Sequence, residues 1–224
     1  IGGTADGTVA TTGTWFLGDP IGSNAQPEDD HTVVGTRCYV TANGSVGGSA
    51  GEADVDGGQT TLTSALLSVS GLDDPKVSYW RWYSNDKGSA PNEDTMPIYI
   101  SGNNGLNWVL LELVSENANA WVQKTFRVAD FVSVTAGGVK LKFVARDLGT
   151  GSVVEAAIDD TRVFSTLCPT TIPGDLNGDL SVDSSDLGGL LAAYGPCSNC
   201  PEDFNKSGSV DSEDLGYLLS LFGS

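Results

Sequence analysis

The chain has 224 residues, of which 39% are hydrophobic, 8% are aromatic and 29 are glycine. This composition provides enough apolar surface for a core and favours strands and tight turns over long helices. The formal net charge of −18 argues against nucleic acid as a partner and favours bound cations, and no apolar run approaches the roughly 18 residues of a membrane span, so we expect no membrane insertion.

Four cysteines stand at positions 38, 168, 197 and 200. An even number in an acidic chain rich in Gly, Ser and Thr predicts a secreted protein with disulfides, located extracellularly or at a cell surface. Three pairings are possible, and we predict Cys197–Cys200 and Cys38–Cys168. The CxxC spacing also suits zinc or redox chemistry, but a second CxxC is missing. The sequence starts with isoleucine, so we expect a processed product or a piece of a longer chain.

Residues 1–167 are predicted to form a β-sandwich of antiparallel strands. In VKLKFVA, Val139, Leu141, Phe143 and Ala145 alternate with two lysines, which is the period of a half-buried strand. The other strand candidates are TRCYVT, TTLTSALLSV, KVSYWRWYS, MPIYIS, WVLLELV, WVQKTFRV and VVEAAIDDTRVF. Clusters of Gly, Asn, Asp and Pro separate these runs, and no convincing helix lies between them, which favours a sandwich.

Residues 168–224 are predicted to form a small α-helical domain. The segment CPTTIPG at 168–174 cannot continue a strand or begin a helix. Beyond it the chain repeats itself at an offset of 28, with 12 identical positions in 21. Apolar residues recur at helical spacing in both copies, at Leu187, Leu190, Leu191 and Tyr194, then at Leu215, Leu218, Leu219 and Phe222. We expect these two apolar stripes to face each other.

Each copy begins with a twelve-residue loop in which oxygen-bearing side chains recur at calcium-ligand spacing. The predicted ligands are Asp175, Asn177, Asp179, Ser181, Asp183 and Asp186 in the first loop, and Asp203, Asn205, Ser207, Ser209, Asp211 and Asp214 in the second. Ser181 and Ser209 would contribute backbone carbonyls. At the sharp turn the first loop has Leu180 where the second has Gly208, and a left-handed leucine costs roughly 1–2 kcal/mol. We predict two calcium sites that hold this domain together.

The duplicated loop and helix, closing with Asp rather than Glu, resemble the dockerin module of bacterial extracellular complexes over residues 175–223. This resemblance implies a cohesin-like protein as partner, or another copy of the chain. The matching contact positions are Ser184 and Ser185 in the first copy, and Ser212 and Glu213 in the second. The alternative is that Ser184 and Ser212 only cap the following helices.

The β region resembles MAM-like and carbohydrate-binding jelly rolls of bacterial secreted proteins, on segments such as GEADVDGGQTTLTS and the closing VEAAIDDTRVF. In such modules an Asp of the final strand often helps to hold a structural calcium. The resemblance therefore implies a third calcium site, with Glu52, Asp54, Asp56, Asp159 and Asp160 as candidate ligands.

The run YWRWY at 79–83 places two tryptophans on one strand face and Tyr79, Arg81 and Tyr83 on the other. Because tryptophan is mostly buried in proteins, we predict that Trp80 and Trp82 belong to the core. Tyr79, Arg81 and Tyr83 are then the candidates for stacking against a sugar.

Catalysis has little support in the sequence, because His31 is the only histidine and no nucleophile or zinc motif accompanies it. We predict a non-catalytic extracellular calcium-binding protein whose tail mediates attachment to a partner or self-assembly. The alternatives are a carbohydrate-binding module for polysaccharide and the C-terminal accessory region of a secreted hydrolase.

Overall fold

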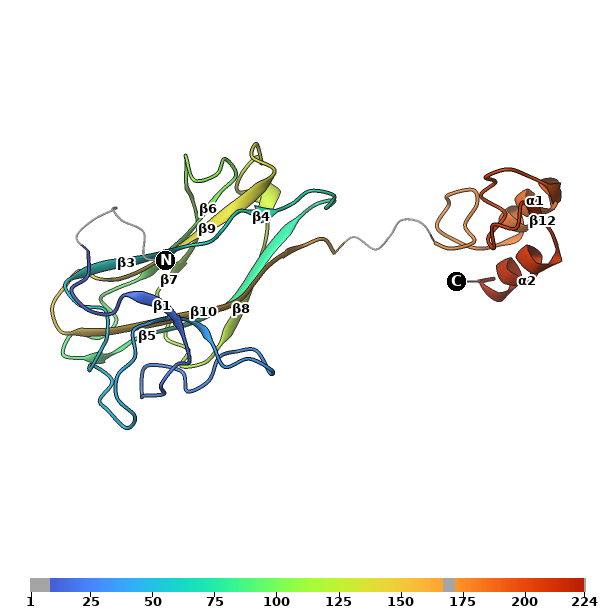
Figure 1. Ribbon diagram of the computed structural model, residues 1–224. Coiled ribbons are helices and arrows are strands. Elements are labelled where there is room, and N and C mark those ends of the chain that lie inside the picture. Colours follow the sequence, from blue (N-terminus) through green and yellow to red (C-terminus); the bar gives the residue numbers. More distant parts are fainter. Residues whose placement is uncertain (1–8, 167–171, 224) are drawn as a thin grey trace. The chain divides into compact units, whose positions relative to one another are not determined.

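The computed structural model describes residues 9–166 and 172–223 (Figure 1). The chain divides into two compact units, Ile1–Thr166 and Leu167–Ser224, and each unit is described here by itself. Neither helix in the described ranges has the length and hydropathy needed to cross a bilayer.

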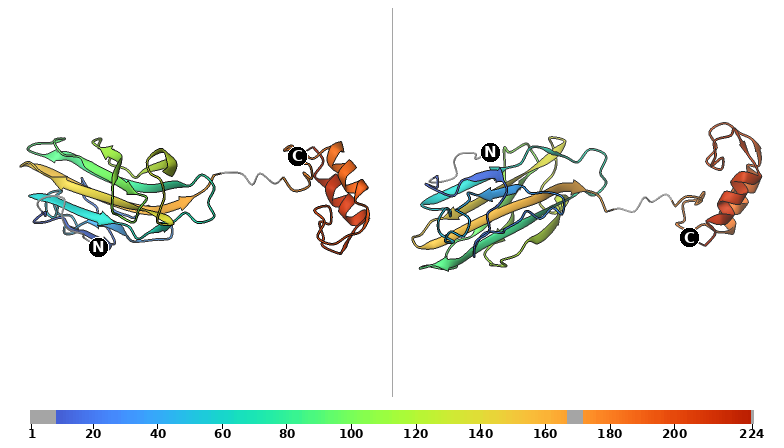
Figure 2. Two further views of the ribbon diagram at one scale, coloured as in Figure 1. Left: turned by 90° about the horizontal axis from the view of Figure 1, so that it is seen from above. Right: turned by 60° about the horizontal axis from the view of Figure 1, so that its bottom comes forward.

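The described part of the first unit is a β-sandwich with one short 3-10 helix. Its elements are β1 (Trp15–Gly18), β2 (Cys38–Thr41), β3 (Gly58–Thr63), β4 (Leu67–Ser68), β5 (Lys76–Gly88), β6 (Met96–Ser101), β7 (Val109–Val114), β8 (Val122–Arg127), η1 (Val128–Asp130), β9 (Gly138–Asp147) and β10 (Ser152–Phe164). One sheet has the order β1-β2-β10-β5-β8 and the other β3-β9-β6-β7, with β4 beside β9. The named strands pair antiparallel, and Figure 2 shows the two sheets as two layers.

The core lies between the two sheets, where one face of each strand is apolar. Val139, Leu141, Phe143 and Ala145 of β9 are all buried, as their alternation with lysines predicts. They pack with buried residues from the facing sheet in one continuous cluster. The prediction of a mostly β, antiparallel sandwich is therefore confirmed.

Strand β5 turns the opposite face to the core from the one that we predicted. Tyr79, Arg81 and Tyr83 are at most 1% exposed, whereas Trp80 and Trp82 are half-buried on the outer face. The side chains alternate as predicted, but the assignment of the two tryptophans to the core was wrong. The three buried side chains cannot stack against a sugar.

The reason for this reversal lies on the opposite sheet. The Arg81 guanidinium donates two hydrogen bonds to Glu112 of β7, at 2.7 and 3.0 Å, and also contacts Glu116. The Tyr79 hydroxyl donates to the other oxygen of Glu112 at 2.7 Å. Because Arg81 and Tyr79 find partners between the sheets, burial of this face leaves no charge uncompensated.

The second unit contains two short helices, α1 (Ser184–Ala192) and α2 (Ser212–Ser220), and two short strands, β11 (Gly195–Pro196) and β12 (Ser209–Val210). Its fully buried apolar residues are Val182, Leu190, Val210 and Leu218. The predicted stripes are only partly buried, because the helices end before Tyr194 and Phe222. Those two residues and the stripe members Leu191 and Leu219 are about half exposed, at 46–52%.

The predicted disulfide between Cys197 and Cys200 is present. Cys38 is instead a buried free thiol on β2, which corrects its predicted pairing. Cys168, the predicted partner, lies outside the described residues.

Candidate functional site

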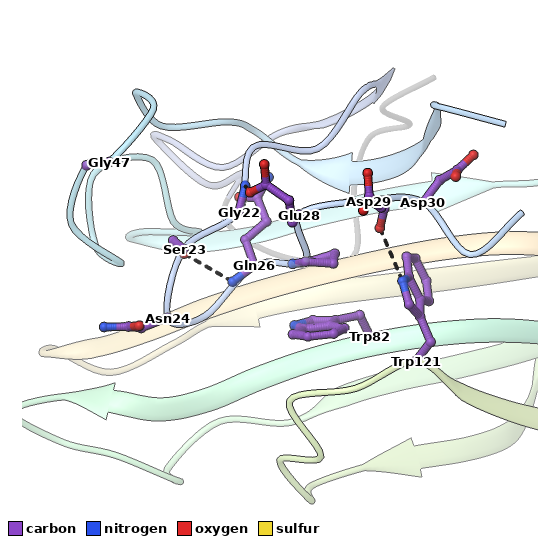
Figure 3. Close-up of a pocket in the computed structure, with 12 residues that line it drawn as sticks. Gly22, Ser23, Asn24, Gln26, Glu28, Asp29, Asp30, Gly47, Trp82 and Trp121 are labelled. Carbon is purple, nitrogen blue, oxygen red and sulfur yellow. Dashed lines mark hydrogen bonds between the residues drawn. The ribbon is translucent and has the colours of Figure 1, made fainter. Parts of the chain in front are cut away.

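An aromatic groove lies on the outer face of the sheet β1-β2-β10-β5-β8. We use this name for Trp80, Trp82, Trp121 and His31. The groove contains a hollow of about 660 Å³ beside the segment that joins β1 to β2 (Figure 3). Its lining consists of Gly22, Ser23, Asn24, Gln26, Pro27, Glu28, Asp29, Asp30, Gly47, Gly48, Trp82 and Trp121.

The two tryptophans of this hollow are fixed by their indole N–H groups. Trp82 on β5 donates to the backbone carbonyl of Ala25 at 2.8 Å, and Trp121 donates to that of Asp29 at 3.3 Å. The two rings meet edge to face, with centroids 6.2 Å apart and an interplanar angle of 73°. Both side chains are half-buried. Their exposed surfaces are therefore oriented before any ligand arrives, which lowers the entropy lost on binding.

His31 continues the aromatic row along the sheet. Its ring stacks on Trp80 with centroids 3.6 Å apart and lies edge-on to Trp121 at 6.2 Å. Its Nδ1 lies 2.7 Å from an oxygen of Asp160. A second hollow of about 460 Å³ opens here, beside Trp80 and Arg162. The groove thus joins two hollows through one run of ring contacts.

Polar groups from the β1–β2 segment form the rim. Gln26 is buried, and its backbone N–H donates to Ser23 at 3.1 Å, which fixes the turn of the segment. Asn24 and Asp29 are exposed at the edge of the hollow (Figure 3). Asp30 accepts the backbone N–H of Arg37 at 2.9 Å. Carboxylate and amide groups around an apolar floor are suited to hydroxyl-rich neutral ligands, and the negative rim opposes anionic ones.

Small apolar residues support the groove from below. Cys38, Val40 and Ala157 form a buried cluster against which Trp82 and Trp121 pack. Burial raises the pKa of the Cys38 thiol to about 12, and the charge of nearby Asp159 adds to this effect. Cys38 is therefore a packing residue, and its thiol is unreactive at neutral pH.

The five candidates for a third calcium site do not come together. Glu52 is exposed and accepts hydrogen bonds from Ser45, at 2.9 Å from the amide and 2.7 Å from the hydroxyl. Asp159 accepts the backbone N–H of His31 at 3.0 Å, in the groove. Its neighbour Asp160 lies beside His31 as well, whereas Asp54 and Asp56 lie in the segment before β3. Among the described residues, no three of these carboxylates gather closely enough to hold a metal ion, although the charges of Asp54 and Asp56 act on each other; the third calcium site stays a prediction.

The loops of the second unit fold around their first and last aspartates. Asp175 accepts the backbone N–H groups of Gly178 at 2.7 Å and Leu180 at 3.0 Å. Asp203 in the second loop accepts those of Ser207 and Gly208, at 3.0 and 2.8 Å. Leu180 and Gly208 share the left-handed turn, with φ of +72° and +92°. The first loop therefore keeps the turn despite its leucine, as the repeat predicts.

The last aspartate of each loop accepts several backbone hydrogen bonds. Asp186 is fully buried and accepts backbone N–H groups from Leu176 at 2.8 Å and Asp183 at 2.9 Å. Asp214 has the matching bonds with Phe204 and Asp211, at 2.8 and 3.0 Å. Hydrogen bonds from these N–H groups hold the pKa of both carboxyls below its usual range, and the N–H of Asp183 or Asp211 has the largest effect.

The helices are capped by aspartates and not by the serines that follow them. Asp183 and Asp211 are the N-cap residues, each within a capping box. The alternative interpretation, in which Ser184 and Ser212 cap the helices, is therefore wrong. Both serines, like Ser185 and Glu213, are exposed on the first turn of a helix.

The donor set of the two loops consists of oxygen atoms from Asp, Asn and Ser, which is the chemistry that calcium prefers. In the described ranges, no group of three or more His, Cys, Asp and Glu side chains is gathered closely enough to hold a metal. The loop carboxylates are engaged by backbone N–H groups instead. The residues thus fit calcium in type and order, and the loop backbone already follows the repeat.

Trp121 and the rim residues were missed by sequence reasoning. The signal for Trp121 was weak, since one tryptophan before a strand has no period of its own. The β1–β2 segment has no motif, and its place over β5 follows only from the strand order. The sequence did contain a signal for Trp80 and Trp82. They alternate with an Arg, and if the Arg is buried against a partner on the other sheet, the two tryptophans must face outward.

No protein-family model and no curated protein matches the chain. Among solved structures, TmCBM61 in complex with β-1,4-galactotriose is similar with a TM-score of 0.36 and 14% identity, covering 61% of this chain and 74% of that one. A family 16 carbohydrate-binding module has 0.34 and 11%, covering 70% and 99%. CBM28, specific for non-crystalline cellulose, has 0.38 and 11%, covering 71% and 88%. This likeness concerns the mostly β sandwich fold alone.

Proposed function

We propose that the first unit is a non-catalytic carbohydrate-binding module, and that the aromatic groove binds an extracellular polysaccharide. The observation that carries this proposal is the fixed edge-to-face pair of Trp82 and Trp121 above the sheet. Sugar rings have apolar C–H faces and a rim of hydroxyl groups. An amphipathic aromatic floor with a polar rim is complementary to both.

Charge favours a neutral glycan over an acidic one. Glu28, Asp29 and Asp30 line the first hollow, and the whole chain carries a formal charge of −18. An anionic polysaccharide would meet repulsion at the rim and in the wider field of the protein. Neutral glycans avoid this cost and can use the carboxylates as hydrogen-bond acceptors.

Substitution of Trp82 by Ala in the full chain tests the proposal. We expect the affinity for a neutral polysaccharide that binds the wild type to fall by about tenfold or more, since aromatic anchors dominate binding sites. Trp108 is half-buried beside Lys142 of the other sheet, so Trp108→Ala is the matched control. Equal losses in the two variants, or no binding in a broad screen of neutral glycans, would contradict the proposal.

His31 has a positioning role here, and we propose no catalytic step. It is the only histidine and is held between Trp80 and Asp160. Its ring therefore supports the groove surface between the two hollows.

A second function is favoured by the duplicated surface of the C-terminal unit. We propose that this unit binds calcium in both loops and attaches the chain to a cohesin-like protein or to a second copy. Leu191 and Leu219 occupy equivalent positions and are 51% and 50% exposed. Ser184 and Ser212 also occupy equivalent positions in the two copies, and both are exposed. Two equivalent exposed patches on a small unit are typical of an interaction surface.

The first and last aspartates of each loop, with the Asn and Asp or Ser between them, would hold calcium in this proposal. The ion would supply positive charge at a cluster of acids and stabilise the folded unit. Calcium titration calorimetry of the full chain, compared with an Asp175→Asn, Asp203→Asn double variant, tests it. We expect two fewer ions per chain in the variant. Equal stoichiometry would contradict this proposal and leave the groove untouched.

A further inference from the structure

The disulfide between Cys197 and Cys200 lies directly before the second loop of the C-terminal unit, in the segment that joins α1 to that loop. In this segment Gly195 and Pro196 form β11, which pairs with β12 inside the loop. An EF-hand has a helix before its calcium loop. Here the ring of four residues that the disulfide closes stands in that place.

This disulfide ring is hydrogen-bonded to two separate points of the second loop. The backbone N–H of Cys197 donates to the carbonyl of Gly208 at 3.0 Å, and the N–H of Asp203 donates to the carbonyl of Cys200 at 3.3 Å. Asp203 is the first residue of the loop, and Gly208 is its left-handed turn. The side chain of Asp203 in turn accepts the N–H of Gly208 at 2.8 Å. The ring, the first aspartate and the turn therefore form one closed set of contacts.

The first loop repeats part of this arrangement without the covalent link. The N–H of Asp175 donates to the carbonyl of Ile172 at 3.0 Å, which matches the bond between Asp203 and Cys200 at the 28-residue offset. Ile172 stands at the position of Cys200, and among the described residues no disulfide borders the first loop. The two loops thus share their internal hydrogen bonds and differ in this one restraint, so that each is a control for the other.

A small reagent can reach the disulfide. Both cysteines are half-buried, and they line a hollow of about 620 Å³ together with the exposed residues Ser198 and Asn199. A dithiol that enters this hollow can supply two electrons and two protons. The S–S bond then breaks, two cysteine thiols form, and the dithiol is oxidised to its own disulfide.

We infer that the ring of Cys197 and Cys200 holds the second loop in its calcium-binding form, so that reduction by a dithiol weakens this site and spares the first. The inference rests on the calcium function proposed for the C-terminal unit. A disulfide removes conformations from the unrestrained chain, and a site that is organised in advance loses less entropy on binding. After reduction the segment before Asp203 gains freedom, and its bond to Gly208 is no longer held by the ring.

Calcium calorimetry of full-length chains that each retain one site tests the inference. Asp175→Asn leaves the second site, and Asp203→Asn leaves the first site as the matched control. We expect dithiothreitol to lower the calcium affinity of the Asp175→Asn chain by about tenfold, and that of the Asp203→Asn chain by less than about twofold. Adding Cys197→Ser and Cys200→Ser to the Asp175→Asn chain should cause the same loss and remove the sensitivity to the dithiol.

The wild-type chain provides a second measurement if a variant fails to fold. In saturating calcium, reduction should raise amide hydrogen exchange in residues 195–210 and leave exchange in residues 175–183 unchanged. An unchanged second site after reduction, or equal effects on the two loops, would overturn this inference and leave the proposed calcium function standing. If the oxidised wild-type chain binds no calcium in its C-terminal unit, the proposed calcium function fails, and the inference fails with it.

Discussion

The two units of the chain are held together by different kinds of interaction. In the described residues of the sandwich, one continuous cluster contains 20 buried core residues. The corresponding cluster of the C-terminal unit contains four. At its centre that unit instead has Asp186 and Asp214, each accepting several backbone N–H groups. Apolar burial therefore stabilises the first unit, whereas the second depends on carboxylates that organise its loops.

Acidic residues are used differently in the two regions. In the C-terminal unit the acids recur at fixed spacing within one loop, and the chain between them folds locally. In the sandwich the buried acids come from distant segments and meet only after the sheets have formed. Glu112 of β7 is an example, since its partner Arg81 lies on β5 and the two side chains bind across the two layers.

Removal of calcium should reveal the largest difference in stability between the two units. We expect EDTA to abolish hydrogen-exchange protection across residues 172–223, because four buried apolar residues cannot offset the repulsion among the loop acids. Protection in β5, β9 and β10 should remain. Hydrogen exchange measured by mass spectrometry with and without EDTA checks this. Unchanged protection in the C-terminal unit would show that it folds without metal.

The inter-sheet ion pair gives the largest single-residue effect expected in the sandwich. Replacing Arg81 by Ala leaves the mostly buried Glu112 with only the partly exposed Lys124, at 3.3 Å, as a charged partner, which costs about 3–5 kcal/mol of unfolding free energy. Arg127 also pairs with two acids but lies at the surface, so Arg127→Ala is the matched control and should cost far less. Urea denaturation of both variants checks the difference. Similar losses would show that burial of Arg81 does not matter.

Glu155 should make the stability of the sandwich depend on pH. Burial raises its pKa from 4.5 to about 8, and Asp54 adds to the shift. Between these values the folded chain keeps a proton that the unfolded chain has released, so stability falls as pH rises from about 5 to 8. The loss should be on the order of 3 kcal/mol. Thermal unfolding of the wild type and Glu155→Gln checks it, because the variant should show a flatter profile, and parallel profiles would contradict the assignment.

The smallest effect concerns the turn that the two loops share. Leu180→Gly should stabilise the C-terminal unit by about 1 kcal/mol, since glycine relieves the left-handed backbone. Gly208→Ala is the reverse control at the equivalent position, where a Cβ would meet no atom within 4 Å, and should destabilise by a similar amount. Thermal melts in calcium-saturated buffer, followed by far-UV circular dichroism, check both changes. Effects of the same sign would show that backbone strain is not the cause.

Much of the C-terminal unit could be predicted from the sequence. Its loop order, its shared turn at Leu180 and Gly208, and its disulfide are local features that close within a few residues. The helix ends were less predictable, because Tyr194 and Phe222 continue the apolar period after the helices have ended. Capping was also missed, since Asp183 and Asp211 compete with the neighbouring serines for the same backbone N–H groups.

The alternation along β5 and β9 and the 28-residue repeat could be read from the sequence alone, because side-chain direction and loop spacing follow from backbone geometry. The buried face of β5 could not be predicted in this way, because it depends on the tertiary structure, which places Glu112 on the opposite sheet as a partner for Arg81. The tertiary structure also brings Trp121 beside Trp82 and Asp94 beside Asp147, since strand order, and not distance along the chain, determines which residues meet.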